Sequence, residues 1–161
     1  MQIDYEEKLR KFIEDDNVKA EQIFFENLVD HKENVLNTIK EKNINFHDIV
    51  KTVIFIDLDN KIEYGNAVIA IVPAESRVDK DKLKKICNLR IKIASPDEVL
   101  ILTSYPAGGV PPFGFKGNFF IEETLLDKDI VYAGGGSIMT LVKTSIKEII
   151  KANKARNASI L

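Results

Sequence analysis

Glycine and proline are concentrated in two short stretches of this chain, and these stretches could form a binding site. Seven of the eight glycines follow residue 107. The first stretch, residues 105–114, also holds three of the five prolines, and the second is residues 134–137. Glycine permits positive φ and close approach of a ligand to the backbone, and proline makes a loop rigid. Such a loop is typical of a preformed site wall, with a rigid structural loop as the alternative.

Two phosphate-binding motifs are excluded by the same residues. Gly109 to Gly114 have the spacing of a Walker loop, but Phe115 stands where the lysine is required. The two prolines inside this loop also lack the N–H groups that hold phosphate. Residues 134–136 lack the third spaced glycine of a dinucleotide fingerprint and are followed by strand-like residues, which excludes that motif too.

Lys51 is the other candidate for chemistry. It opens an otherwise apolar strand and shares a face of that strand with Val53 and Phe55. If this face points inward, the ammonium group lies at the rim of a pocket and is available to an anionic or carbonyl group. The alternative is a lysine that extends from the strand end to water.

The composition excludes several classes of protein. With 161 residues, 45% hydrophobic and 30% charged, the chain fits one soluble folded domain rather than a disordered one. No apolar run approaches the roughly 20 residues of a membrane helix, and we expect a cytoplasmic protein with no membrane partner. One cysteine, Cys87, and two histidines, His31 and His47, make a metal or redox site improbable. Cys87 is expected to be a small hydrophobe on a helix.

Hydrophobic periodicity and capping residues predict the elements. In the first half these are a helix over residues 5–13, a strand over 23–25, a helix from Asp30 to about Lys42, and strands over 49–58 and 62–72 joined at Asp59-Asn60. In the second half these are a helix over 79–87, a strand over 90–94, a helix capped by Ser95, a strand near 119–121, a helical turn near Leu125, strands over 129–133 and 138–142, and a last helix capped by Thr144. The mixture predicts an α+β (mixed α/β) fold.

Five motifs occur in the order seen in one known family. They are Val50–Phe55, Ala70–Pro73 with Arg77–Asp79, Ala94–Val99, Gly108–Gly114 and Gly134–Ser137. On these motifs the chain resembles the YbaK family of aminoacyl-tRNA deacylases, which are related to the editing domain of bacterial prolyl-tRNA synthetases. The resemblance runs from Ile23 to the C-terminus. It implies a single editing domain over residues 1–161, with residues 1–20 as an N-terminal helical extension.

The resemblance implies a barrel-like mixed sheet surrounded by helices, and a pocket that hydrolyses the ester of mischarged aminoacyl-tRNA without cofactor or metal. An aminoacyl ester is already reactive, so a lysine and backbone N–H donors would suffice. The implied catalytic residues are Lys51, Gly135 and Ser137. The implied substrate-binding residues are Phe25, Thr52, Gly108, Gly109, Val110, Pro111, Phe113, Gly114, Gly134, Gly136 and Thr140.

The chain departs from the family at two positions. Many members have a histidine three residues after the serine of the second glycine loop, where this chain has Thr140, so the role of that histidine does not carry over. The early-strand tyrosine of some bacterial members is also absent, with Phe24 and Phe25 nearby. A non-catalytic module that binds an aminoacyl-adenosine and docks on a synthetase is therefore the alternative function.

The expected partner is mischarged tRNA, bound weakly and transiently. The net charge of −2 hides an acidic N-terminal third, because residues 1–50 carry 7 Lys/Arg and 12 Asp/Glu. Basic residues outnumber acidic ones over 79–92 and again over 143–156, and either patch could follow phosphates. Ordinary solvated helix faces are the alternative for both, and the acidic residues 1–20 could instead bind a partner or a second copy.

Overall fold

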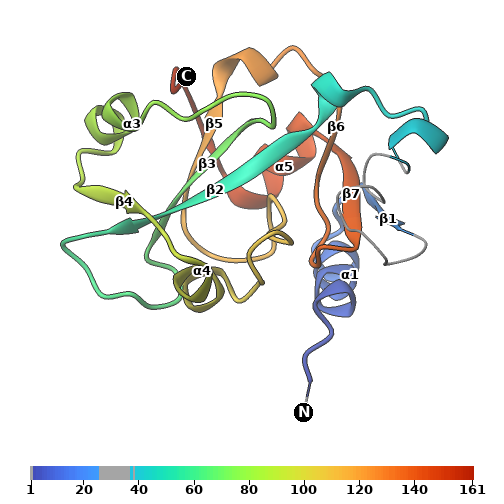
Figure 1. Cartoon of the computed structure of the whole chain (residues 1–161), viewed down its shortest axis with the longest axis horizontal. Helices are drawn as coiled ribbons and strands as arrows, with labels where there is room; N and C mark the ends of the chain where they lie inside the picture. The colour runs from blue at the N-terminus through green and yellow to red at the C-terminus, as the bar shows by residue number, and fades with distance from the viewer. Residues whose placement is uncertain (1, 26–36, 38) are drawn as a thin grey trace.

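The computed structural model describes residues 2–25, 37 and 39–161, which form two β-sheets with helices packed against them (Figure 1). The elements in chain order are α1 (Tyr5–Asp15), β1 (Ala20–Phe24), the 3-10 helix η1 (Phe46–Asp48), β2 (Val50–Asp57), β3 (Ala67–Pro73), α3 (Lys80–Cys87), β4 (Ile91–Ile93), α4 (Pro96–Thr103), β5 (Asn118–Glu122), the 3-10 helix η2 (Glu123–Leu125), β6 (Ile130–Gly134), β7 (Thr140–Ser145), α5 (Ile146–Asn153) and β8 (Arg156–Ala158). The predicted α+β class is confirmed.

The two sheets differ in topology. The smaller has the order β1-β7-β6 and is antiparallel, and the larger has the order β4-β2-β3-β5-β8. In the larger sheet β4, β2 and β3 are antiparallel, whereas β3, β5 and β8 are parallel. A bridge between Ile49 and Tyr132 joins the sheets at one point. The edge strands β4 and β8 pair only with β2 and β5, not with each other, so the barrel-like closure that we expected is not formed by the described strands.

The larger sheet is covered on both faces. One face contributes residues such as Ile54, Ile69 and Ile121 to the main core, which the smaller sheet also enters through residues such as Val142. The other face forms a second cluster beneath α3, with Leu83 at its centre. Strands buried on both faces read as continuous apolar runs, which explains the sequence of β3. Adjacent residues of β2 therefore face different surroundings.

The N-terminal helix α1 packs against the main core. Leu9 is fully buried, and the ring of Phe12 stacks on that of Phe113 with 5.8 Å between the ring centroids. The Asp4 side chain caps the helix by accepting a hydrogen bond from the N–H of Glu7. The segment that we expected to be an extension thus contacts the same core as the two sheets (Figure 1).

The predicted hairpin of β2 and β3 is present, but its loop is longer than expected. Residues 58–66 separate the two strands, so the predicted strand start at Ile62 is wrong. The side-chain amide of Asn66 donates to the carbonyl oxygen of Lys61, and Gly65 has φ of +95°. A side chain that bonds to nearby backbone competes with the strand ladder, which accounts for the late start of β3.

The prediction was also wrong at the end of the chain. Ser145, not Thr144, caps α5, because its hydroxyl oxygen accepts from the N–H of Glu148. Thr144 lies in β7 and donates to the carbonyl oxygen of Lys19. The prediction missed β8, and β7 begins two residues later than expected. The predicted helix start at Asp30 lies outside the described residues.

Other predicted starts and helices are confirmed. Ser95 and Glu98 form a reciprocal capping box at the start of α4. Cys87 is the last residue of α3 and packs against the second cluster, but it is half-buried, whereas we expected a buried small hydrophobe. No helix in the described part of the chain is long and apolar enough to span a bilayer.

Glu122 fixes the C-terminal strand to β5. Its carboxylate is 2% exposed and accepts hydrogen bonds of 2.9 Å from the backbone N–H groups of Ile160 and Thr124. Burial opposes ionisation of this carboxyl, but the hydrogen bonds outweigh it and hold the pKa of Glu122 below its ordinary value. The charged form of Glu122 therefore stabilises the fold.

We predict that Glu122→Ala lowers the free energy of unfolding by about 1–3 kcal/mol, because the buried N–H of Ile160 and the N–H of Thr124 lose their acceptor. Glu123→Ala changes an exposed neighbour and is the matched control, with an effect within about 0.5 kcal/mol. Urea unfolding at neutral pH measures both.

The pH dependence provides a second check. Because the pKa of Glu122 is lowered on folding, its contribution is complete above the ordinary value of 4.5 and is lost as the pH falls through the folded-state pKa. The stability difference between the native protein and Glu122→Ala is therefore expected to shrink below pH 4.5. A constant difference down to pH 3 would contradict this role.

Candidate functional site

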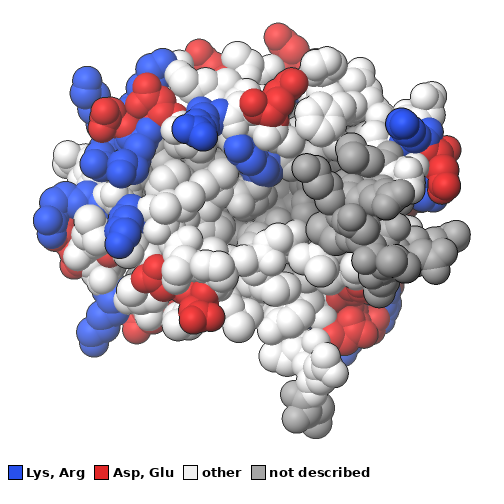
Figure 2. Space-filling view, in the orientation of Figure 1, with Lys and Arg blue, Asp and Glu red and all other residues white. Residues whose placement is uncertain are grey.

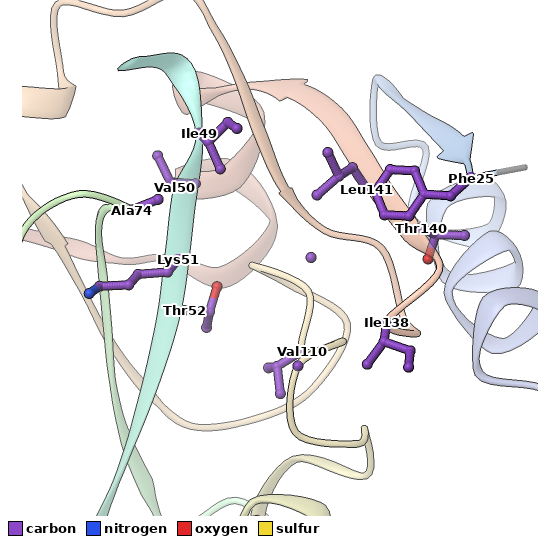
Figure 3. Close-up of a pocket in the computed structure, with 12 residues that line it drawn as sticks. Phe25, Ile49, Val50, Lys51, Thr52, Ala74, Val110, Ile138, Thr140 and Leu141 are labelled. Atoms are coloured by element: carbon purple, nitrogen blue, oxygen red, sulfur yellow. The ribbon is translucent and has the colours of Figure 1, made fainter. Parts of the chain in front are cut away.

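A pocket of about 270 Å³ lies between β2 and the turn that joins β6 to β7 (Figure 3). The proline-containing glycine loop closes one side of it. Its wall consists of Phe25, Ile49, Val50, Lys51, Thr52, Ala74, Gly108, Val110, Gly134, Ile138, Thr140 and Leu141. Most of these are apolar, and Lys51 is the one charged residue of the wall within the described part of the chain.

The structure brings half of the predicted site residues together in this wall. They are Phe25, Lys51, Thr52, Gly108, Val110, Gly134 and Thr140. Five other predicted residues belong to the two loops but do not line the pocket. They are Gly109, Pro111, Gly135, Gly136 and Ser137. Phe113 is fully buried in the main core, and Gly114 contacts α1.

Five further residues of the wall were not predicted. They are Ile49, Val50, Ala74, Ile138 and Leu141. Ile49 and Val50 directly precede Lys51, and Ile138 directly follows Ser137. Their position next to predicted site residues is the signal that could have identified them. Ala74 reaches the pocket because its N–H donates to the carbonyl oxygen of Ile49, a contact between distant residues that no local pattern indicates.

Lys51 and Thr52 leave β2 on opposite faces. Lys51 shares its face with Phe55 of the second cluster, and Thr52 shares its face with Ile54 of the main core. In Figure 3 the side chain of Lys51 extends away from Val110. It makes no ion pair or side-chain hydrogen bond with any described residue. Its charge is therefore available at the pocket rim.

The hydroxyl oxygen of Thr52 is buried and has no hydrogen-bond partner among the described residues. Thr52 lies in the pocket wall, where a ligand can supply the missing partner (Figure 3). A buried polar atom without a partner costs free energy, and such atoms are rare in folded proteins. The Thr52 hydroxyl therefore makes no hydrogen bond to the described part of the fold and is accessible from the pocket wall.

The two glycine loops touch through their backbones. A Cβ atom on Gly134 would overlap the carbonyl oxygen of Val110, and one on Gly109 would lie 2.6 Å from the Cα of Ser137. The N–H of Gly136 donates to the carbonyl oxygen of Gly109 at 2.8 Å. Glycine is required at these positions because no side chain fits between the loops.

Three backbone N–H groups of the pocket wall remain available. Those of Gly108, Val110 and Ile138 donate to no group within the described residues. By contrast, the N–H of Gly135, which we predicted to be catalytic, donates to the carbonyl oxygen of Thr140 at 3.2 Å. Free donors on both loops can hold a developing negative charge.

The second predicted catalytic group of this turn, Ser137, points away from the pocket. Its hydroxyl donates to the carboxylate of Glu6 in α1 at 2.7 Å and accepts from the N–H of Met139 at 3.0 Å. Thr140 lies in the pocket wall, with its hydroxyl oxygen 3.4 Å from that of Ser137. The N–H of Phe25 donates to the carbonyl oxygen of Met139, which fixes Phe25 beside the turn.

Tyr105 supports the first loop from the core side. It is fully buried, and burial raises the pKa of its hydroxyl well above the ordinary value, so the group stays protonated. A Cβ atom on Gly114 would lie 3.3 Å from this hydroxyl. Among residues 2–25, 37 and 39–161, no three His, Cys, Asp or Glu side chains are grouped so that they could hold a metal ion.

Comparison with known proteins gives one family and several relatives. The family model described as an aminoacyl-tRNA editing domain matches residues 31–152. The protein YwhH of Bacillus subtilis (strain 168), described as uncharacterized, is 30% identical over 88 residues. That match covers 53% of this chain and 56% of YwhH, so it spans little more than half of each protein.

Two solved structures share the fold. The hypothetical protein APE2540 superposes with a TM-score of 0.79 at 24% identity, covering 95% of this chain and 98% of that one. A protein described as a candidate trans-editing enzyme for prolyl tRNA synthetase gives a TM-score of 0.79 at 22% identity, covering 99% of this chain and 98% of that one. At this identity the likeness concerns the fold alone.

The unpartnered hydroxyl of Thr52 gives a prediction about stability. Thr52→Val keeps the shape of the side chain and removes no hydrogen bond, so the free energy of unfolding should stay unchanged or rise by up to about 1 kcal/mol. Urea unfolding measures the change.

Thr103→Val is the matched control. The Thr103 hydroxyl is buried, donates to the carbonyl oxygen of Val99 at 2.8 Å and accepts from the N–H of Tyr105. Its loss should lower the free energy of unfolding by about 1–3 kcal/mol. Equal losses in both variants would mean that the Thr52 hydroxyl contributes to stability after all.

Proposed function

Because the chain belongs to the aminoacyl-tRNA editing domain family, we propose that it is a free-standing deacylase that hydrolyses the ester of mischarged aminoacyl-tRNA. The aminoacyl group occupies the pocket, and the terminal adenosine lies at the pocket mouth. One observation carries this proposal. Three backbone N–H donors, from Gly108, Val110 and Ile138, lie in the pocket wall without a partner among the described residues, and Lys51 at the pocket rim forms no ion pair with any of those residues.

The free donors match the needs of ester hydrolysis. Water attacks the ester carbonyl carbon, and the carbonyl oxygen becomes an oxyanion, which the N–H groups of Gly108, Val110 and Ile138 stabilise. The bond to the ribose oxygen then breaks, and the proton given up by the water goes to that oxygen. The products are a free amino acid and tRNA with its terminal hydroxyl restored. The pocket contributes mainly position and polarity, since the ester is already activated.

Lys51 acts as an electrostatic anchor rather than as a base. Its ammonium group extends away from the wall that holds the free donors, so it suits a phosphate or ribose oxygen at the mouth better than the reacting carbonyl (Figure 3). A lysine is a point charge with three donors, which fits a phosphate oxygen. Anchoring the nucleotide places the ester over the pocket.

The pocket wall favours a small uncharged amino acid. Apolar side chains from Ile49, Ile138 and Leu141 surround the cavity of about 270 Å³, and no carboxylate of the described residues lies in its wall. The Thr52 hydroxyl, which has no partner among the described residues, is a polar group that the amino acid meets. A hydrophobic pocket separates side chains that differ by one methylene by only about 1–3 kcal/mol, so pocket size sets an upper limit on what enters.

The tRNA backbone follows the basic patch on α3 and β4. Lys and Arg side chains gather over these elements on a face that is also hollowed near its centre (Figure 2). The other basic patch includes α5, which lies behind β2 and β6 in Figure 1. Arg90 of the first patch forms an ion pair with Asp59, which weakens the electrostatic attraction between Arg90 and phosphate. We therefore expect weak, transient binding, in the cytoplasm where charged tRNA is used.

A non-catalytic binding module is the second candidate. Lys51 is the one ionisable residue of the pocket wall within the described part of the chain, and Thr140 stands where many family members have a histidine. The described wall thus offers no general base. Such a module would hold an aminoacyl-adenosine while docked on a synthetase.

A panel of mischarged tRNAs tests the first candidate. The native protein should release amino acid from at least one member faster than the spontaneous rate. Lys51→Ala should lower kcat/KM about 10- to 100-fold, because a hydrogen bond to a charged group contributes about 1.5–3 kcal/mol. Lys61→Ala, an exposed lysine of the loop between β2 and β3, is the control and should match the native protein.

Binding of a non-hydrolysable aminoacyl-adenosine analogue separates the two candidates. Turnover of a mischarged tRNA supports the deacylase. Binding of the analogue without turnover on any tRNA supports the module and rejects the deacylase. If the native protein and Lys51→Ala release amino acid only at the spontaneous rate and neither binds the analogue, both candidates are wrong.

A further inference from the structure

The turn between β6 and β7 forms one wall of the pocket, yet its central residues face the other way. Gly134, Ile138 and Thr140 line the pocket, whereas Ser137 directs its hydroxyl to Glu6 of α1 at 2.7 Å. The same hydroxyl oxygen accepts from the N–H of Met139 at 3.0 Å. Ser137 therefore links α1 to the backbone that carries the pocket residues.

The backbone of the turn is held between α1 and the first glycine loop. Gly136 has φ of +102°, and a Cβ atom on it would lie 2.7 Å from the carbonyl oxygen of Tyr5 in α1. On its other side, the N–H of Gly136 donates to the carbonyl oxygen of Gly109. A displacement of α1 would therefore move Gly136, and with Gly136 both the turn and the first glycine loop.

The start of α1 is itself fixed to the body of the protein. The side-chain amide of Gln22 in β1 donates to the carbonyl oxygen of Glu6 at 2.9 Å. Two residues later, the ammonium group of Lys8 donates to the carbonyl oxygen of Ser104 at 3.0 Å and lies 4.8 Å from the ring centroid of Tyr105. Glu6 thus presents its carboxylate from a rigid position.

From these contacts we propose that Glu6 is a positioning residue, which holds the pocket wall in place through Ser137. Helix α1 therefore contributes to the geometry of the site. The charged hydrogen bond from Ser137 to Glu6 fixes the turn in the position from which Ile138 and Thr140 line the pocket. In this arrangement Ser137 acts on the wall rather than on the substrate. The part of this inference that concerns deacylation rests on the proposed function, and the part that concerns loop geometry does not.

Amide hydrogen exchange, measured by NMR on the full chain, tests the loop geometry directly. Glu6→Ala should raise the exchange rates of the Gly135 and Gly136 amides at least about 10-fold, because the turn loses its external fastening. Glu6→Gln keeps an acceptor oxygen for the Ser137 hydroxyl and should stay within about 3-fold of the native rates. Ser137→Ala should raise these rates at least as much as Glu6→Ala, because it also removes the acceptor of the Met139 N–H, and the double variant should be no worse than Ser137→Ala.

Glu7→Ala is the matched control on the same helix. Glu7 pairs with Arg10 on the exposed side of α1, so its loss should leave exchange in the turn unchanged. Urea unfolding midpoints are measured alongside, so that faster exchange in the turn is separated from a general loss of stability.

Deacylation and analogue binding provide the second readout. If the native protein is a deacylase, Glu6→Ala should lower kcat/KM about 10-fold with KM nearly unchanged, and Glu6→Gln should restore it. A native protein without turnover rejects the proposed function but leaves the exchange result to decide the role of Glu6. Native exchange rates in Glu6→Ala, or equal damage from Glu6→Gln, would overturn the inference.

Discussion

The pocket depends on a contact between backbones rather than between side chains. The loop of residues 108–114 and the turn of residues 134–140 approach so closely that no Cβ atom fits at Gly109 or Gly134. The hydrogen bond from Gly136 to Gly109 fixes the distance between them. This hydrogen bond satisfies one backbone pair, whereas the N–H groups of Gly108, Val110 and Ile138 in the pocket wall donate to no described residue and are available to a ligand.

Strand β2 forms the opposite side of the pocket. Because the strand is pleated, neighbouring residues of β2 point to opposite faces of the sheet. Thr52 faces the main core, and Lys51 faces the side of the second cluster. A buried sheet with both faces covered is a rigid support, so the Thr52 hydroxyl and the backbone that carries Lys51 keep a fixed relation to the glycine loops. The apolar burial that stabilises the larger sheet is thus also what positions the polar groups of the site.

The sequence could predict elements whose signals are local. β-branched runs indicate β2 and β3, and the Ser95 and Glu98 pair marks the start of α4. What it could not predict comes from contacts between distant residues. Nothing near Ser137 indicates that its hydroxyl turns to Glu6, 131 positions away, instead of to the pocket.

The same limit applies to the candidate site. Residue types and a family resemblance predicted the glycine loops and Lys51 as parts of the site. The fold shows that these segments lie next to one another in space. Gly135 was expected to supply a donor to the substrate, but its N–H is used within the turn. Residue types therefore identified the segments of the site, whereas the hydrogen bonds of the structure show which of their N–H groups have no partner among the described residues.

The pairing of β1 with β7 has a consequence for how the molecule forms. Residues 20–24 pair with residues 140–144, so the smaller sheet joins segments from opposite ends of the chain. Contacts of such long sequence separation slow folding, because a large loop must close before any of them is made. During synthesis, β1 cannot form this pairing until residues 140–144 have emerged. The pocket, whose wall includes Phe25 and Leu141, is thus among the last features of the molecule to exist.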